Sequence, residues 1–291
     1  MQRVLIIGND ADTYAVSQSP HLQRCVVEIA DGCADALQRV RDHAFDVVLT
    51  NPLTTIKEDL ALVTQMEIIR PGIKTIILTP EATPEDVIAA LRAHVFACFS
   101  SPIDVNEVAA MIAQAADATN WNDGIEVIAA DPNWIALRVN CRLLTADRLT
   151  RFMAELRSDL IDAERSSLLV AFREILLNAM EHGGGLDPDQ VIDVSAVRTK
   201  RAIVYHFRDP GPGFNGIQMR HAAINNPPDN PVAHLEVREA HGIRPGGFGI
   251  MIAQQLVDEL VYNEHGNEAL LIKHTVPGFP IADDSNGKLE A

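Results

Sequence analysis

The chain has too few basic residues for nucleic-acid binding to be its main activity. Its 24 Lys and Arg residues stand against 40 Asp and Glu residues, and the formal net charge is −16 at pH 7. Binding to nucleic acid depends on Lys and Arg side chains that neutralise phosphates, so this balance argues against it. The best local basic cluster consists of Arg198, Lys200 and Arg201, which we interpret as a solvated turn.

Long apolar runs and clustered cysteines are also missing. No stretch reaches the roughly 20 apolar residues of a membrane span, and the apolar segment 3–8 is too short for a signal peptide. The four cysteines, Cys25, Cys33, Cys98 and Cys141, lack metal-ligand spacing, so we expect reduced thiols in the core. We therefore expect a cytoplasmic protein with no membrane segment, and its 291 residues suit two domains.

Strand patterns alternate with helix patterns through residues 1–119. Strands are expected at 3–8, 25–29, 46–50, 74–79 and 95–99, and helices at 11–17, 33–43, 56–69, 84–93 and 104–116. This alternation predicts a parallel, doubly wound sheet of the flavodoxin-like kind. The segments 30–32, 45–50 and Ser101-Pro102 make this half similar to a response-regulator receiver domain. An unrelated flavodoxin-like domain is the alternative.

The phosphorylation chemistry that this resemblance implies is missing from the sequence. The key positions of a receiver site hold the wrong residue types: Asn51 for the phosphoacceptor Asp, Gly8 and Asn9 for the acidic pair, with Asp10 one place late, and Ser101 for the Lys. Only the switch-type Thr79 remains. An amide cannot form an acyl phosphate, so we expect a degenerate receiver domain, or pseudo-receiver, that takes no phosphate.

A second domain is expected at 125–275, after a polar linker at 120–124 and before a loose tail at 276–291. Strands are expected at 125–129, 134–139 and 201–208, and an apolar run follows at 250–260. Helices are expected at 145–160, with Thr145 as a candidate N-cap, and at 166–182. We find no internal repeat or low-complexity block.

The helix at 166–182 carries three polar residues in an otherwise apolar pattern. Glu174, Asn178 and His182 are spaced at i, i+4 and i+8, which places them in one stripe beside the apolar face. A buried polar group without a partner costs roughly 1–3 kcal/mol, so these side chains need partners. A hydrated magnesium ion with nucleotide phosphates is one solution, and capping of neighbouring backbone is the other.

Two glycine-rich segments follow this helix. Residues 209–213, Asp-Pro-Gly-Pro-Gly, come directly after a strand, where the Asp209 carboxylate can accept from an amino group such as the adenine N6 and glycines allow close approach of a flat base. Residues 244–250 lead into an apolar helix, whose free N–H groups can bind phosphate. The alternatives are an ordinary Pro-Gly turn and a simple loop before a helix.

In this order and at this spacing, the three segments resemble those of the histidine-kinase-like ATPase superfamily, which has an α/β-sandwich fold. Residues about 125–275 are most similar to the anti-sigma-factor serine kinases of bacterial partner-switching systems, and residues 256–273 resemble the closing strands of that group. The resemblance implies Asn178 as magnesium ligand and Glu174 as the base toward an acceptor hydroxyl. It also implies a nucleotide site that contains these residues: His182, Asp209, Gly211, Gly213, Gly246, Gly247 and Gly249.

Three functions compete at this stage. The first is an ATP- and Mg²⁺-dependent serine/threonine kinase acting on a small regulatory partner, an anti-sigma antagonist or sigma-factor type of protein. The second is a non-catalytic, nucleotide-gated module that sequesters such a partner. A histidine kinase is the least supported, because no His lies in an H-E-x-x-x-P setting. We also expect a homodimer, a mobile lid at 214–245, and nucleotide affinity that is nearly independent of residues 1–119.

Overall fold

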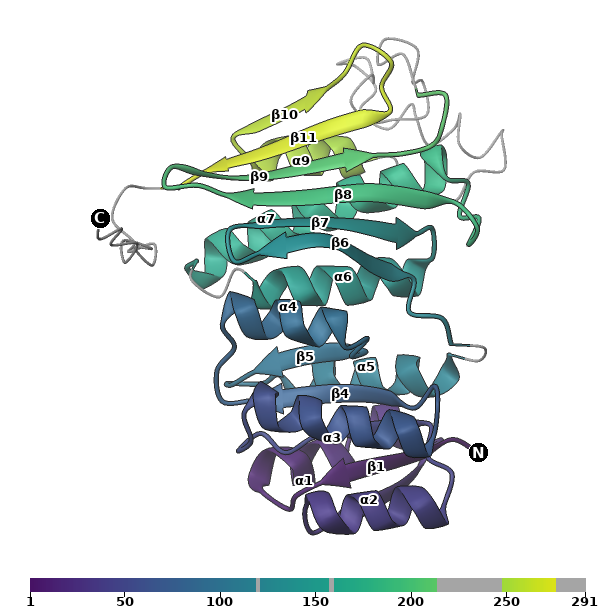
Figure 1. Cartoon of the computed structure of the whole chain (residues 1–291). Coiled ribbons are helices and arrows are strands. Elements are labelled where there is room, and N and C mark those ends of the chain that lie inside the picture. The colour runs from purple at the N-terminus through teal and green to yellow at the C-terminus, as the bar shows by residue number, and fades with distance from the viewer. Residues whose placement is uncertain (119–120, 157–159, 214–247, 276–291) are drawn as a thin grey trace, which may run out of the picture.

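The computed structural model describes residues 1–118, 121–156, 160–213 and 248–275. Two α/β domains follow one another along the chain and are stacked end to end, with the N-terminal domain at the bottom of Figure 1. Each domain is built on one sheet.

The N-terminal domain is a doubly wound parallel sheet. Its strands are β1 (Arg3–Ile7), β2 (Val26–Ala30), β3 (Val47–Leu49), β4 (Lys74–Thr79) and β5 (Ala97–Ser100), in the order β2-β1-β3-β4-β5. All neighbouring strands are parallel. The helices are α1 (Ala11–Ser17), α2 (Cys33–Asp42), α3 (Ile56–Ile69), α4 (Pro84–Arg92) and α5 (Val105–Asp117), with a short 3₁₀ turn at Pro20–Leu22. This arrangement confirms the predicted flavodoxin-like receiver fold.

Local signals explain why the predicted boundaries in this domain are accurate. Thr55 and Thr83 each begin a helix with a complete capping box, in which the side chain accepts from the third helical N–H and the acidic residue there bonds back. All six residues of β4 are buried, as a central parallel strand covered on both faces requires.

The C-terminal domain is an antiparallel sheet with helices on one face. Its strands are β6 (Ile125–Asp131), β7 (Trp134–Asn140), β8 (Val191–Arg198), β9 (Ala202–Arg208), β10 (Glu259–Tyr262) and β11 (Glu268–His274), in the order β10-β11-β9-β8-β7-β6. The described helices are α6 (Leu143–Glu155), α7 (Asp162–Asn178), the π-helical turn η2 (Ala179–Gly183) and α9 (Gly249–Leu256). The helices lie behind the sheet in Figure 1, which gives the predicted α/β sandwich.

Several sequence-based expectations for this domain were wrong. Thr145 does not cap a helix: α6 begins earlier, after Arg142, and Thr145 is buried inside it. Strand β8, which pairs with both β7 and β9, was not expected from the sequence.

The cysteines differ in their burial. In the N-terminal domain Cys33 is exposed at the start of α2, so it is not a core thiol, and Cys25 is only partly buried. Cys98 and Cys141 are buried, as expected.

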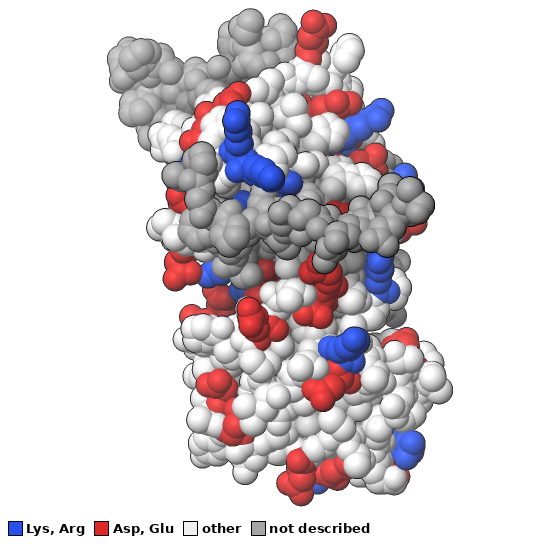
Figure 2. Space-filling view, turned by 60° about the vertical axis from the view of Figure 1, so that its left-hand side comes forward, with Lys and Arg blue, Asp and Glu red and all other residues white. Residues whose placement is uncertain are grey.

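Acidic side chains are prominent on the surface. Asp and Glu side chains are spread over the face shown in Figure 2 and outnumber Lys and Arg there. The basic cluster includes the exposed hairpin turn between β8 and β9. Within the described ranges, no helix is both long enough and apolar enough to span a bilayer.

Candidate functional site

The candidate site begins at the C-terminal end of α7. Most of this helix is buried against the sheet, with Phe172 in edge contact with Tyr205 at 4.8 Å between ring centroids. Glu174 lies one turn before Asn178, the last α-helical residue. The next five residues form the π-helical turn, a wider coil that recurs at functional sites. This turn ends the predicted stripe at Asn178, and His182 lies on the exposed surface.

The N-terminus of α9 lies directly against the two polar residues of α7. A Cβ atom added to Gly249, the first residue of α9, would be 2.5 Å from Glu174 Oε2 and 3.3 Å from Asn178 Nδ2. A side chain at this position would force the Glu174 carboxylate to move, whereas glycine leaves it in place. No side chain caps α9 within the described residues. The first N–H groups of α9 and its positive dipole end therefore face the same place as a carboxylate and an amide.

Asn178 leaves an unused donor at this junction. Its Nδ2 atom is buried and has no hydrogen-bond partner among the residues that the structure describes. A buried donor left unpaired costs about 1–3 kcal/mol, so its retention here indicates a partner from outside the described residues. The alternative of backbone capping, which the sequence left open for this side chain, is not seen in the described structure.

The Asp209 carboxylate forms the second part of the site, beyond the π-helical turn. It packs against the Cα atom of Gly183, where any Cβ would overlap the carboxyl group. Asp209 Oδ1 accepts a 2.9 Å hydrogen bond from the Gly211 N–H. A Cβ on Gly211 would in turn be 2.7 Å from the Gly183 Cα. The last residue of the π-helical turn, Gly183, thus lies against the Asp209 side chain. The five-residue turn therefore connects Asn178 in the first part of the site with Asp209 in the second.

Burial controls the electrostatics around Asp209. Burial raises the pKa of the Asp209 carboxyl, while the hydrogen bond from Gly211 opposes this rise. Burial, with a smaller contribution from the charge of Asp209, also raises the pKa of the Tyr262 hydroxyl. The pKa of the Cys141 thiol rises to about 11, mainly through burial and then through Asp187 and Asp209. Neutral thiol and phenol groups therefore lie near a carboxylate that is partly removed from water.

The turn between β10 and β11 holds the glycine segment from the other side. Gly213 has a φ of +77°, and a Cβ there would collide with the His265 carbonyl. The backbone N–H of Asp209 donates to the Asn267 carbonyl at 3.0 Å. Asn263 Oδ1 accepts from three successive N–H groups of the same turn, which fixes its shape. Gly211 and Gly213 are therefore required because a Cβ at either position would clash with neighbouring backbone. Asp209 is the residue of this segment whose side chain belongs to the candidate site.

The structure brings together Glu174, Asn178 and Gly249, and places Asp209 with Gly211 at the other end. Gly246, Gly247 and the expected lid at 214–245 lie outside the described residues. Gly183 and Cys141 also lie close to Asp209 and were not expected there from the sequence. The run Gly183-Gly-Gly185 directly after His182 was the available signal, since three glycines at a helix end indicate close approach of another segment.

The degenerate site of the N-terminal domain has its predicted residues side by side. A Cβ on Gly8 would collide with the Asn51 amide and lie 3.5 Å from Asp10 Oδ2. Asp10 is engaged as the N-cap of α1: its Oδ1 accepts from the Asp12 N–H at 2.9 Å, and its Oδ2 from the Thr13 hydroxyl at 2.8 Å. Asn51 Oδ1 accepts from the Leu53 N–H at 2.7 Å. These polar atoms are satisfied within the domain.

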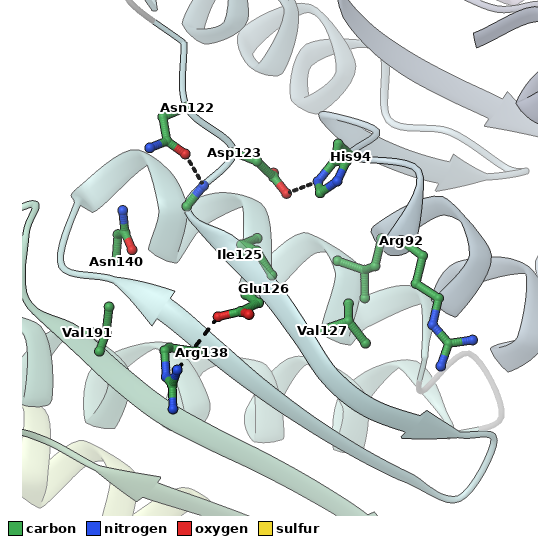
Figure 3. A pocket seen from close by; sticks show the side chains of 12 residues that line it. Arg92, His94, Asn122, Asp123, Ile125, Glu126, Val127, Arg138, Asn140 and Val191 are labelled. Carbon is green, nitrogen blue, oxygen red and sulfur yellow. Dashed lines mark hydrogen bonds and ion pairs between the residues drawn. The ribbon is translucent and has the colours of Figure 1, made fainter. Parts of the chain in front are cut away.

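A cleft of about 460 Å³ lies elsewhere, at the seam between the two domains. Figure 3 shows it between Arg92 and His94 of the N-terminal domain and Arg138 and Asn140 of β7. It shares no residue with the site on α7 and α9. Within the described ranges there is also no cluster of three or more His, Cys, Asp or Glu residues suited to a metal ion.

Comparisons with known proteins bear on the two domains separately. The model of the family described as "Histidine kinase-like ATPase domain" matches residues 141–273. No curated protein matches the chain.

Solved structures similar to the chain include a CheY-like response regulator receiver domain protein from Methanospirillum hungatei, with 24% identity over 40% of this chain and 94% of that one and a TM-score of 0.36. The HemR receiver domain from Leptospira biflexa shows 16% identity over 42% and 99%, with a TM-score of 0.36. A CpaE2 pilus assembly protein from Sinorhizobium meliloti shows 13% identity over 39% and 98%, with a TM-score of 0.35. The fold of the N-terminal domain rests on its own strand order and direction.

Proposed function

Residues 141–273 form a histidine kinase-like ATPase domain, and from this premise we propose that the protein transfers the γ-phosphate of ATP to a Ser or Thr of a small regulatory protein. The observation that carries the proposal is the meeting of the Glu174 carboxylate and the Asn178 amide at the N-terminus of α9, which no side chain of the described residues caps. A carboxylate can act as a base and a helix N-terminus can bind an anion, which supports phosphoryl transfer at this point.

The described residues fit an adenine nucleotide. Asp209 Oδ1 is used by Gly211, whereas Oδ2 accepts no hydrogen bond from the described residues and can accept from the adenine amino group. The glycine backbones on either side, Gly183 and Gly211, leave room where side chains would fill the space. The first N–H groups of α9, which no side chain of the described residues caps, suit the phosphates.

Asn178 would hold the magnesium ion through its side-chain oxygen, and its unpaired Nδ2 would then be free to donate to a phosphate oxygen. The ion supplies neutralisation of the phosphate charge when it is bound. Magnesium is typically held by one or two protein oxygens together with water and substrate phosphates, so a single amide oxygen suits it better than a cluster of acidic residues.

Glu174 is proposed as the base toward the acceptor hydroxyl. Its Oε2 atom is the side-chain atom nearest to the start of α9, ahead of the Asn178 amide. A carboxylate in this place can take the proton of an incoming Ser or Thr hydroxyl as the new bond to phosphorus forms. A positioned base contributes about 10²–10⁴-fold to the rate.

The test is phosphoryl transfer by the full chain from labelled ATP to a candidate partner, followed by mapping of the phosphorylated peptide. Glu174→Gln should lower transfer by at least about 100-fold and leave nucleotide binding intact, whereas Asn178→Ala should lose both. Glu164→Gln, on the same helix and more than two turns earlier, is the matched control and should behave as wild type.

Two results would contradict the proposal. One is a partner that binds in a nucleotide-dependent way and is never phosphorylated, which would favour the sequestering function. The other is transfer that Glu174→Gln does not slow. The class of partner and the homodimer stay predictions. Analytical ultracentrifugation of the full chain measures its oligomeric state and so tests the homodimer.

A further inference from the structure

Each domain covers the free edge of the other domain's sheet. β5 and β6 are edge strands of the two sheets. The C-terminal domain's α6 packs along β5, and the N-terminal domain's α4 packs along β6. Both helices lie at the junction of the two domains in Figure 1. An edge strand presents unpaired N–H and C=O groups, and a helix laid over it is one way in which proteins protect it.

Arg148 of α6 satisfies the first end of the β5 edge. Its side chain is only 1% exposed, and its guanidinium donates to the Phe96 carbonyl at 2.8 Å and to the Val95 carbonyl at 3.2 Å. The same group donates to the carbonyl and the carboxylate of Asp123, each at 2.5 Å. It also lies over the Phe96 and Trp121 rings, at 4.8 Å and 4.4 Å. A fully buried cation thus joins α6, the linker and the start of β5.

Glu155, two turns further along α6, satisfies the other end of the edge. Its carboxylate is 2% exposed and accepts from the Ser100 hydroxyl at 2.5 Å and from the Ser100 N–H at 3.3 Å. Arg151 pairs with Glu155 and lies over the Phe99 ring at 4.7 Å. The contacts with Ser100 and Phe99 join α6 to β5 and are lost if α6 moves away, whereas the Arg151–Glu155 pair lies within α6.

The apolar core is continuous across this junction. One buried cluster contains Val87 and Leu91 of α4 together with Ile125 of β6 and Leu149 of α6. On its far side α6 packs against α7, where Arg173 donates to Asp147 Oδ1 at 2.7 Å and 3.1 Å. Arg173 is the residue before Glu174, so the helix that closes the β5 edge also supports the helix that carries the site.

We propose that the receiver-like domain is a fixed structural partner of the ATPase domain and that α6, held by Arg148, keeps α7 and its site residues in place. The α4 and β5 surface is then used within the chain and is closed to other proteins. The receiver-like domain cannot be removed without loss of order in α7, in contrast to the expectation from sequence. Neither statement depends on the identity of the ligand that the site binds.

The experiment uses the full chain with a protease recognition sequence inserted between residues 118 and 121. After cleavage, the two halves of the wild type should elute together in gel filtration at micromolar concentration. Arg148→Met should weaken their association by roughly 100-fold or more, because the contacts of a buried cation are lost. Arg138→Met is the matched control: it also lies at the seam, but its side chain is 49% exposed, and it should have no effect.

Hydrogen exchange of α7 amides reports the second half of the proposal. In the cleaved Arg148→Met protein these amides should exchange at least about 10-fold faster than in the cleaved wild type. Where Arg148→Met does not fold, Glu155→Gln serves instead, with about a 10-fold weaker association expected because a neutral amide accepts the hydroxyl and N–H of Ser100 more weakly than the carboxylate does. Separation of the wild-type halves, an unchanged association in both variants, or unchanged α7 exchange after separation would each overturn the proposal.

Discussion

Replacement of Asp209 by Asn should weaken nucleotide binding without destabilising the protein. Its Oδ1 is held by the Gly211 N–H at 2.9 Å, so the amide oxygen of the substitute would keep this place and its NH₂ group would replace Oδ2. A donor would then face the amino group of adenine. A hydrogen bond to a charged group contributes about 1.5–3 kcal/mol, so the Kd for ADP should rise about 10–150-fold.

The stability of the nucleotide-free Asp209→Asn protein should be equal to or higher than that of the wild type. Burial raises the pKa of Asp209, which means that its charge is disfavoured in the folded protein at neutral pH. A neutral amide of the same shape removes this cost, so the Tm without nucleotide should be equal to or above that of the wild type. Loss of affinity together with a lowered Tm would indicate a packing defect instead.

The same pKa shift predicts how affinity depends on pH. Because the folded-state pKa of Asp209 is raised, the carboxylate takes up its proton at a higher pH than an exposed aspartate does. Protonation replaces an acceptor by a donor, so the ADP affinity of the wild type should fall as the pH is lowered through that value. Asp209→Asn should lack this dependence.

Isothermal titration calorimetry of the full chain with ADP and magnesium measures both effects. Asp162→Asn is the control, because its side chain is 91% exposed at the start of α7, away from the site. An affinity of Asp209→Asn within twofold of the wild type, at neutral pH and with the control unchanged, would refute the role assigned to this carboxylate.

Three further predictions follow from other parts of the molecule. Gly249→Ala should lower phosphoryl transfer at least about 10-fold, because its Cβ would lie 2.5 Å from Glu174 Oε2 and displace that carboxylate from the start of α9; Gly32→Ala, with no atom within 4 Å, is the control in the same assay, and equal rates would contradict this. Acetyl phosphate should leave the intact mass of the chain unchanged, since Asn51 stands at the acceptor position; an adduct of phosphate mass on a nearby aspartate would show that the receiver-like domain is active. Asp59 is 1% exposed and burial raises its pKa from 3.8 to about 6, against the opposing hydrogen bonds from the Thr50 and Thr54 hydroxyls, so its contribution to stability is present below about pH 4 and is lost as the pH rises through 6; in denaturant unfolding, the free energy of unfolding of the wild type should fall more steeply between pH 4 and pH 7.5 than that of Asp59→Asn, and equal pH dependence of the two proteins would contradict the shift.

Much of the fold could be predicted because its signals are local. The parallel domain alternates short apolar strands with helices that carry their own caps, and α1, α3 and β4 have the predicted bounds. The prediction of the antiparallel domain was less complete, because one of its strands was not expected. β8 mixes polar and apolar residues with one exposed aspartate, and its strand character depends on pairing with β7 and β9 on either side.

The sequence by itself determined which residue types the site contains. The spacing of Glu174 and Asn178, the strand that ends at Asp209, and the glycine that opens α9 are short-range features, and a helix or a turn fixes their mutual placement within a few residues. The same holds for the degenerate receiver site, where the absence of the acceptor carboxylate can be read from Asn51 alone.

Only the tertiary structure decided how these segments meet. Three features depend on segments far apart in the chain: Asn178 keeps a donor without a partner among the described residues, Gly183 lies on Asp209, and Arg148 is buried against the other domain. In the sequence Arg148 is an ordinary polar residue of an amphipathic helix. Its role arises because β5 has a free edge, and an unpaired edge must find hydrogen-bonding partners wherever the fold brings them.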